Sequence, residues 1–209
     1  MTERAILPES FFLPSAEIVA PRLLGHWLIR NTVDGPCGGP IVEVEAYLAN
    51  DPACHAYRGQ TARNRTMWGP PGRAYVYFIY GCHFCVNAVC GERGNAEAVL
   101  IRAIEPAVGE EFMRRNRAVK TRLELTNGPA KLCSAMHIDR RLDGANLCDG
   151  ESTLYIAPNP NGQEFTDTHG PILASQRIGI SKAADMRLRF YLAASPFVSR
   201  HPRQSSRLC

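Results

Sequence analysis

Two carboxylates and a tyrosine alternate along the apolar segment 41–47, which reads Ile-Val-Glu-Val-Glu-Ala-Tyr. In a β-strand, Glu43, Glu45 and Tyr47 share one face, and the opposite, apolar face packs into the core. We therefore expect the two carboxylates to face solvent or a cleft, where a carboxylate can act as a general base. Alternation treats Glu43 and Glu45 alike, so the pattern leaves both as candidates for that base.

A second segment gathers aromatic side chains. Tyr75, Tyr77 and Tyr80 precede Gly81, and the apolar stretch 84–89 follows. This order predicts a β-hairpin that turns at Gly81 and carries Tyr80 at its tip, where an aromatic ring could act as a wedge. A stacking surface, a carboxylate and a wedge are what an enzyme needs to pull a base out of duplex nucleic acid and hydrolyse its bond to the sugar.

Two polar residues interrupt apolar strands near these groups. Asn87 lies in the returning strand of the hairpin, and Arg102 lies in a third predicted strand, 98–104. A buried polar side chain must find hydrogen-bonding partners. We expect Arg102 either to contact a glutamate or to face a cleft.

The remaining patterns predict the elements that position these residues. An amphipathic helix is expected over 15–24, interrupted at Pro21 and ended by Gly25, and a strand is expected from Trp27. A helix begins near Asn127 with Pro129 in its first turn. Its free amides and Lys131 could hold a phosphate, or the segment could simply be a capped helix. Residues 157–171 read as a surface loop and 187–192 as a late strand.

Composition bounds the class of protein. The chain has 209 residues, 45% of them hydrophobic, which suits a single globular domain. It has no apolar run long enough for a membrane span, and its first residues lack the features of a signal peptide. We expect a soluble, intracellular protein, in the cytoplasm or nucleoid of a bacterium or the nucleus of a eukaryote. The net charge of +4 is compatible with a nucleic-acid partner.

Basic residues gather in three places. The loop that holds Arg58, Arg63 and Arg65 follows the carboxylate strand directly, and we interpret it as a phosphate contact. The other two groups are interpreted as a solvated helix face and a flexible basic tail over about 200–209. They are Arg114, Arg115, Arg117, Lys120 and Arg122 on a helix from Gly109, and His201, Arg203 and Arg207 in the tail.

The chain has eight cysteines, and Cys82 and Cys85 have the C-x-x-C spacing. A structural zinc site normally needs a second such pair, which this chain lacks. Free cysteine also packs as a small apolar residue. We therefore expect no metal site, and an intracellular location argues against a disulfide framework.

Five motifs in chain order together resemble one known family. They are 41–47, the triplet 63–65 (Arg-Asn-Arg), 75–81 (Tyr-Val-Tyr-Phe-Ile-Tyr-Gly), 127–133 (Asn-Gly-Pro-Ala-Lys-Leu-Cys) and 177–180 (Arg-Ile-Gly-Ile). From about residue 11 to 199 the chain resembles the alkyladenine (3-methyladenine) DNA glycosylase family. The resemblance implies an α+β fold of one domain, 1–209, with a curved antiparallel sheet, surrounding helices and a protruding β-hairpin that inserts into DNA.

The resemblance also implies roles, position by position. Glu45 matches the general base that activates the attacking water, and Arg102 and the backbone carbonyl of Ile178 match groups that help to hold this water. Tyr80 matches the wedge, and Asn87 matches the residue that crowds a guanine amino group. The other matched positions are Tyr47, His55 and Tyr77 in the base pocket and Thr61, Arg63, Met67, Lys131 and Lys182 at the DNA backbone.

The implied activity is that of a monofunctional DNA glycosylase of base excision repair. It would act on double-stranded DNA that contains alkylated or deaminated purines such as hypoxanthine, and it would leave an abasic site. The resemblance also implies a monomer that needs no cofactor or metal ion and does not bind a membrane. No lysine is placed to attack the sugar, so we expect no strand cleavage. The chain departs from the family at the hairpin turn, where Cys82 and His83 follow the glycine.

Two other classes of function remain as alternatives. One is a nucleic-acid binding module of the same fold without catalysis, for which a carboxylate in a cleft has no use. The other is a small metal-binding regulator that uses Cys54, His55, Cys82 and Cys85.

Overall fold

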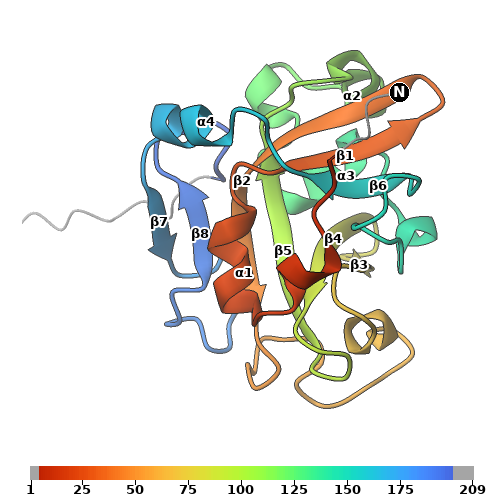
Figure 1. The fold of residues 1–209 in the computed structure, drawn as a ribbon, viewed down its shortest axis with the longest axis vertical. Coiled ribbons are helices and arrows are strands. Elements are labelled where there is room, and N and C mark those ends of the chain that lie inside the picture. Colours follow the sequence, from red (N-terminus) through yellow and green to blue (C-terminus); the bar gives the residue numbers. More distant parts are fainter. Residues whose placement is uncertain (1–4, 200–209) are drawn as a thin grey trace, which may run out of the picture.

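The computed structural model describes residues 5–199, so the expected tail 200–209, with His201, Arg203 and Arg207, lies outside the described residues. The fold is α+β, a single domain built on a curled antiparallel sheet (Figure 1). The strands are β1 (Trp27–Thr32), β2 (Gly35–Tyr47), β3 (Ala74–Ile79), β4 (His83–Cys90), β5 (Glu97–Ile104), β6 (Leu154–Ala157), β7 (Ile172–Ser175) and β8 (Arg189–Leu192).

The sheet runs in the order β3-β4-β5-β2-β1-β6, and β8 joins it through β2 and pairs β7 on its other side. The long strand β2 holds this arrangement together, since its first half pairs β1 and its second half pairs β5 and β8. A Cβ on Gly39 would lie 1.9 Å from the carbonyl oxygen of Glu105, so only glycine fits where the sheet curls there.

Helices cover the sheet where its apolar side chains need burial. Helix α1 (Ala16–Leu23) crosses β2 and β5 on the near side of Figure 1, and α3 (Pro129–Ala135) packs against β4 and β5. The other helices are α2 (Glu110–Asn116), α4 (Gly162–His169) and four short 3-10 turns: η1 (Glu9–Phe12), η2 (Arg65–Trp68), η3 (Arg122–Glu124) and η4 (Arg140–Leu142). Val42, Val44 and Ala46 are fully buried in the core beneath α1, as their alternation predicts.

The predicted hairpin is present. Strands β3 and β4 pair from Ala74 opposite Ala88 to Ile79 opposite His83, and a three-residue turn joins them. Tyr80 and Gly81 in this turn have φ angles of 52° and 71°. A left-handed conformation is uncommon for tyrosine and raises the free energy of the turn.

Three expectations about helices were wrong. Pro21 lies inside α1 rather than interrupting it, and the helix ends two residues later, at Leu23. Helix α2 ends at Asn116, so Arg117, Lys120 and Arg122 lie beyond it. Residues 157–171 are not a simple loop, because α4 occupies the middle of this range.

Local pairs explain α4 despite its turn-forming composition. Gln163 donates to the carboxylate of Asp167 one helical turn away at 2.9 Å, and the rings of Phe165 and His169 stack at 4.0 Å. Gly170, with φ of 77°, follows the helix and lets the chain turn away. Among residues 5–199, no helix is long and apolar enough to cross a membrane.

Candidate active site

A cavity of about 350 Å³ lies between strands β2 to β5, the start of α3 and the loop that leads from β7 to β8. Its size falls in the range of small-molecule sites. The residues that line it come from widely separated segments. They are Glu45, Tyr47, Ala53, His55, Met67, Tyr75, Tyr77, Ile79, Tyr80, Cys85, Asn87, Ala98, Leu100, Arg102, Pro129, Ala130, Ile178, Gly179 and Ile180.

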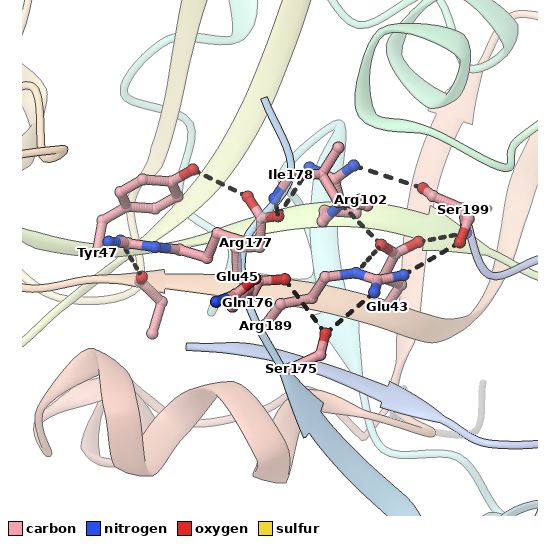
Figure 2. Close-up of polar contacts among 11 residues, drawn as sticks. Glu43, Glu45, Tyr47, Arg102, Ser175, Gln176, Arg177, Ile178, Arg189 and Ser199 are labelled. Atoms are coloured by element: carbon pink, nitrogen blue, oxygen red, sulfur yellow. Dashed lines mark hydrogen bonds and ion pairs between the residues drawn. The ribbon is translucent and has the colours of Figure 1, made fainter. Parts of the chain in front are cut away.

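Glu45 is the carboxylate of this cavity and has no exposed surface outside it. Its Oε1 accepts a hydrogen bond from the backbone N–H of Ile178 at 2.8 Å and lies 3.1 Å from Nη1 of Arg102. Its Oε2 accepts a hydrogen bond from the hydroxyl of Tyr47 at 2.9 Å (Figure 2). Three donors from three segments thus hold the carboxylate in one orientation.

The donors keep their protons. Burial and the neighbouring Glu45 raise the pKa of the Tyr47 hydroxyl, so the hydroxyl stays protonated and donates. Burial lowers the pKa of Arg102, but Glu45 and Glu43 outweigh it, and the pKa is raised overall. Arg102 therefore remains a cation beside Glu45.

Tyr47 is oriented by an arginine behind it. The guanidinium carbon of Arg177 lies 4.6 Å from the centre of the Tyr47 ring, a cation–π contact. Arg177 also donates to the carbonyl of Ala46 at 2.9 Å and to both carboxylate oxygens of Asp51. Since Ile178 follows Arg177 in the chain, the Arg177–Asp51 ion pair holds both Tyr47 and the amide that contacts Glu45.

Aromatic side chains form the wall across β3. The rings of Tyr75 and Tyr77 stack at 5.4 Å, and His55 meets Tyr77 edge-on at 4.5 Å. The His55 ring also shares a 3.0 Å hydrogen bond with the Tyr75 hydroxyl through Nδ1. The structure thus brings the predicted pocket residues Tyr47, His55 and Tyr77 to one cavity.

Asn87 and Cys85 lie on β4 at the cavity wall. The side-chain amide of Asn87 donates to the carbonyl of Tyr75 at 3.0 Å, which fixes its orientation. The thiol of Cys85 contacts Tyr77, and burial raises its pKa, so it is a neutral thiol.

Glu43 lies elsewhere. It is fully buried and does not line the cavity, so the expectation that both carboxylates face solvent or a cleft holds for Glu45 and was wrong for Glu43. Its Oε1 accepts from Nε of Arg102 at 2.8 Å and Nε of Arg189 at 2.6 Å. The backbone N–H of Ser199 donates to its Oε2 at 2.6 Å.

The hairpin turn forms part of the cavity mouth. Tyr80 lines the cavity and is 80% exposed, the most exposed aromatic side chain of residues 5–199. Cys82 is also exposed, and its thiol contacts the carbonyl of Tyr80 at 3.5 Å.

The residues expected at the DNA backbone occupy different environments. Thr61, Arg63 and Lys182 are exposed, and Lys131 at the start of α3 donates to the side chain of Asn127 at 2.7 Å. Arg63 donates to the carbonyl of Phe78 at 3.0 Å and lies 5.7 Å from the Tyr77 ring centre. Met67 is 2% exposed and lines the cavity, so its side chain faces inward.

Asn64 organises the exposed loop. Its side-chain amide donates to the carbonyls of His55 and Gly59, at 2.9 and 3.0 Å, and its carbonyl oxygen accepts from the N–H of Thr61. This buried residue therefore links a wall of the cavity to the loop with Arg63.

Several of these residues were not assigned a role from the sequence. Asp51, Asn64 and Arg189 support the site, yet none belongs to an alternating pattern that would single it out. Cys85 lines the cavity, and from the sequence it was considered only as a metal ligand. A charged residue inside a predicted strand was one available signal for Arg189, as it was for Arg102.

Metal binding was considered for the cysteines and His55. Over the described range 5–199, no group of three or more His, Cys, Asp or Glu side chains is arranged to hold a metal ion.

The chain is similar to known proteins over most of its length. Residues 10–196 match the family model described as "Methylpurine-DNA glycosylase". A relative from Carboxydothermus hydrogenoformans is 45% identical over 93% of this chain and 99% of its own length, and one from Methanoculleus marisnigri is 47% identical over 93% and 98%. A third, from Chlorobium phaeobacteroides, is 48% identical over 92% and 94%. All three bear the name "Putative 3-methyladenine DNA glycosylase".

Proposed function

The chain belongs to the methylpurine-DNA glycosylase family, and from this premise we propose how it acts as a DNA glycosylase in DNA repair. It flips alkylated or deaminated purines out of duplex DNA and binds them in the cavity of Glu45, Tyr47, His55 and Tyr77. A water activated by Glu45 then hydrolyses the N-glycosidic bond. The products are the free base and an abasic site, and the enzyme is monofunctional.

One observation carries this proposal: a buried carboxylate, held by three donors, at the wall of an aromatic cavity. Burying a charge can cost stability even when the charge is paired and hydrogen-bonded, because its desolvation can outweigh the attraction. A module that only binds DNA gains nothing from this expense. The same observation therefore favours catalysis over the non-catalytic alternative.

The chemistry requires little beyond a base. An N-glycosidic bond breaks through a transition state with oxocarbenium character, so a positioned carboxylate can both accept a proton from water and stabilise the positive sugar. A purine alkylated at a ring nitrogen is already cationic, so it can leave without protonation by a general acid. The tyrosine faces attract such a ring by about 0.5–2 kcal/mol each.

Arg102 and Ile178 serve Glu45 in this scheme. The family resemblance implies that the carbonyl of Ile178 helps to hold the water, and the N–H of Ile178 donates to Glu45 at 2.8 Å. Oε1 of Glu45 already contacts two donors, whereas Oε2 accepts one hydrogen bond, from the Tyr47 hydroxyl. Oε2 is therefore the oxygen that accepts the proton of the water in this scheme. No lysine lines the cavity among residues 5–199, which supports hydrolysis without strand cleavage.

The hairpin supplies the opening step. Tyr80 enters the duplex and fills the gap left by the flipped nucleotide, replacing stacking worth a few kcal/mol. Its 80% exposure and its place beside the cavity support this role, because most of its ring is available to contact DNA.

Selectivity comes from Asn87 and from the cost of flipping. The Asn87 amide is fixed by the carbonyl of Tyr75, so it cannot swing away from a guanine amino group. The enzyme acts as a monomer on damaged double-stranded DNA, and Thr61, Arg63, Lys131 and Lys182 contact its phosphates. Met67 makes no such contact in this scheme, because its side chain lines the cavity and its backbone N–H donates to the carbonyl of Asn64 at 3.0 Å.

Base release from duplex oligonucleotides tests the proposal. Each oligonucleotide carries one of 3-methyladenine, 7-methylguanine, hypoxanthine or ethenoadenine, and both free base and strand breakage are measured. We expect release of free base with an intact strand until alkali is added. Tight lesion binding without release would favour the non-catalytic module, and metal in the purified protein would favour the regulator.

A further inference from the structure

Glu43 and Glu45 share one guanidinium. Arg102 contacts Glu43 through Nε at 2.8 Å and Glu45 through Nη1 at 3.1 Å, so its planar group lies between the two carboxylates (Figure 2). Because a guanidinium is rigid, fixing Nε fixes the direction of both Nη atoms.

The pairing of β2 with β5 is irregular and bulged around Arg102. Glu43 pairs with Ala103 and Val44 pairs with Ile101, so Arg102 has no partner on β2, just as Val42 has none on β5. Bulges re-aim side chains and are frequent beside active sites.

The Glu43 end of this bridge is anchored firmly. Glu43 and Arg189 have no exposed surface, and Arg189 also donates to Ser175 and to the carbonyl of Ser199, both at 3.1 Å. Burial raises the pKa of Glu43, but Arg102, Arg189 and the hydrogen bonds from Ser199 outweigh it, and the pKa is lowered overall. Glu43 is thus a permanent anion.

Charges balance only when all four groups are counted. Glu43 and Glu45 carry two negative charges, and Arg102 and Arg189 carry two positive charges. The other titratable groups at this face are Tyr47, with Arg177 behind it, Cys85 beside Glu45 and Arg102, and Tyr191 beneath Arg189. Without Glu43, Arg102 would pair with Glu45 alone and stabilise its anionic form more strongly. A carboxylate stabilised in this way is a weaker base.

We propose that Glu43 is a positioning residue: it holds Arg102 in place and shares its charge, so that Glu45 remains basic enough to activate water. This inference rests on the proposed function, in which Glu45 is the base. It also separates the two glutamates, since Glu43 anchors the arginine and does not reach the cavity.

The test is the pH dependence of single-turnover base release from duplex DNA methylated with dimethyl sulfate, whose cationic bases need no acid. The acidic limb of the pH profile reports protonation of the general base, Glu45. Glu43→Gln should move this limb to lower pH by about one unit and lower the plateau rate roughly tenfold. Arg189→Gln should move the acidic limb to higher pH. Without Arg189, Glu43 has Arg102 as its remaining cation, so Arg102 stabilises the Glu45 anion less.

Glu97→Gln is the matched control. Glu97 is a buried carboxylate of β5 that accepts from the N–H of Ala16 at 2.8 Å, away from the cavity. Its loss should lower Tm without moving the limb. If the acidic limb stays in place in both Glu43→Gln and Arg189→Gln, the inference about Glu43 is overturned. Base release by the wild type would still uphold the proposed function in that case. If Glu43→Gln does not fold, the Arg189→Gln limb alone decides; absence of release by the wild type overturns both proposals.

Discussion

Two regions of the β3–β4 hairpin carry a tyrosine in opposite environments. Tyr77, near its middle, is 9% exposed and contacts His55, Tyr75 and Cys85. Tyr80, at the turn, is 80% exposed and adopts a left-handed conformation. The contrast shows that one hairpin can serve both a rigid cavity and an exposed tip, and it suggests that chemistry and duplex opening are separate.

The supporting contacts differ in the same way. Glu45 forms an ion pair with Arg102 and accepts a hydrogen bond from Tyr47. A cation–π contact joins Tyr47 to Arg177, which forms a buried ion pair with Asp51. Such networks fix side chains within the narrow limits that catalysis requires. A tip that must leave the protein surface for DNA cannot be held this way. Variants of the two regions should therefore fail in different assays.

The largest expected effect belongs to Glu45→Gln. The amide is nearly isosteric but cannot take a proton from water, so single-turnover base release should fall by about a thousandfold or more. Lesion-DNA binding should remain within a few-fold of the wild type. Release close to wild-type rates would remove Glu45 as the base.

Asp51→Asn should have the next largest effect. The neutral amide weakens the hold on Arg177, which orients both Tyr47 and the Ile178 amide, so release should fall by up to about a hundredfold. The measured rate should fall at saturating DNA, with the affinity for lesion DNA little changed. Loss of affinity alone would place Asp51 among the DNA contacts instead.

Tyr80→Ala should lower duplex excision by roughly tenfold, because the gap in the stack is left unfilled. The loss should shrink when the lesion is mispaired or in single-stranded DNA. Val33→Ala at the fully exposed turn between β1 and β2 is the matched control and should change nothing. A lower Tm with equal losses on all substrates would show that Tyr80 is structural.

The smallest effect should come from Asn87→Ser. The shorter side chain widens the cavity beside the carbonyl of Tyr75 and should admit guanine-derived bases more readily. The ratio of hypoxanthine to 7-methylguanine release should fall by about threefold, since small pocket changes discriminate weakly. An unchanged ratio would exclude a gating role.

Much of the fold could be predicted from local patterns. Alternation in 41–47 and in the tyrosine segment predicts β2 and β3 because each strand has one apolar face against the core. Helix α4 was missed because Asn, Gly and Pro around it favour turns, while its stabilising pairs, such as Phe165 with His169, appear only once the helix exists. The 13-residue span of β2 was missed because glycine and proline in its first half are unusual in strands.

The site was less accessible to sequence reasoning. Alternation correctly places Glu43 and Glu45 beside each other, yet it cannot separate them, because the difference comes from Arg189 and Ser199, more than a hundred residues away in the chain. The bulge at Arg102 is likewise a property of pairing between β2 and β5. Such long-range contacts leave no periodic pattern in the sequence.

The separation of chemistry from duplex opening is tested most directly by the fluorescence of 2-aminopurine placed beside a lesion in duplex DNA, since this base brightens when its neighbour unstacks. We expect Glu45→Gln to produce the full wild-type increase in fluorescence without base release, whereas Tyr80→Ala should produce a clearly smaller increase. A full increase with Tyr80→Ala, or none with Glu45→Gln at saturating protein, would contradict this separation.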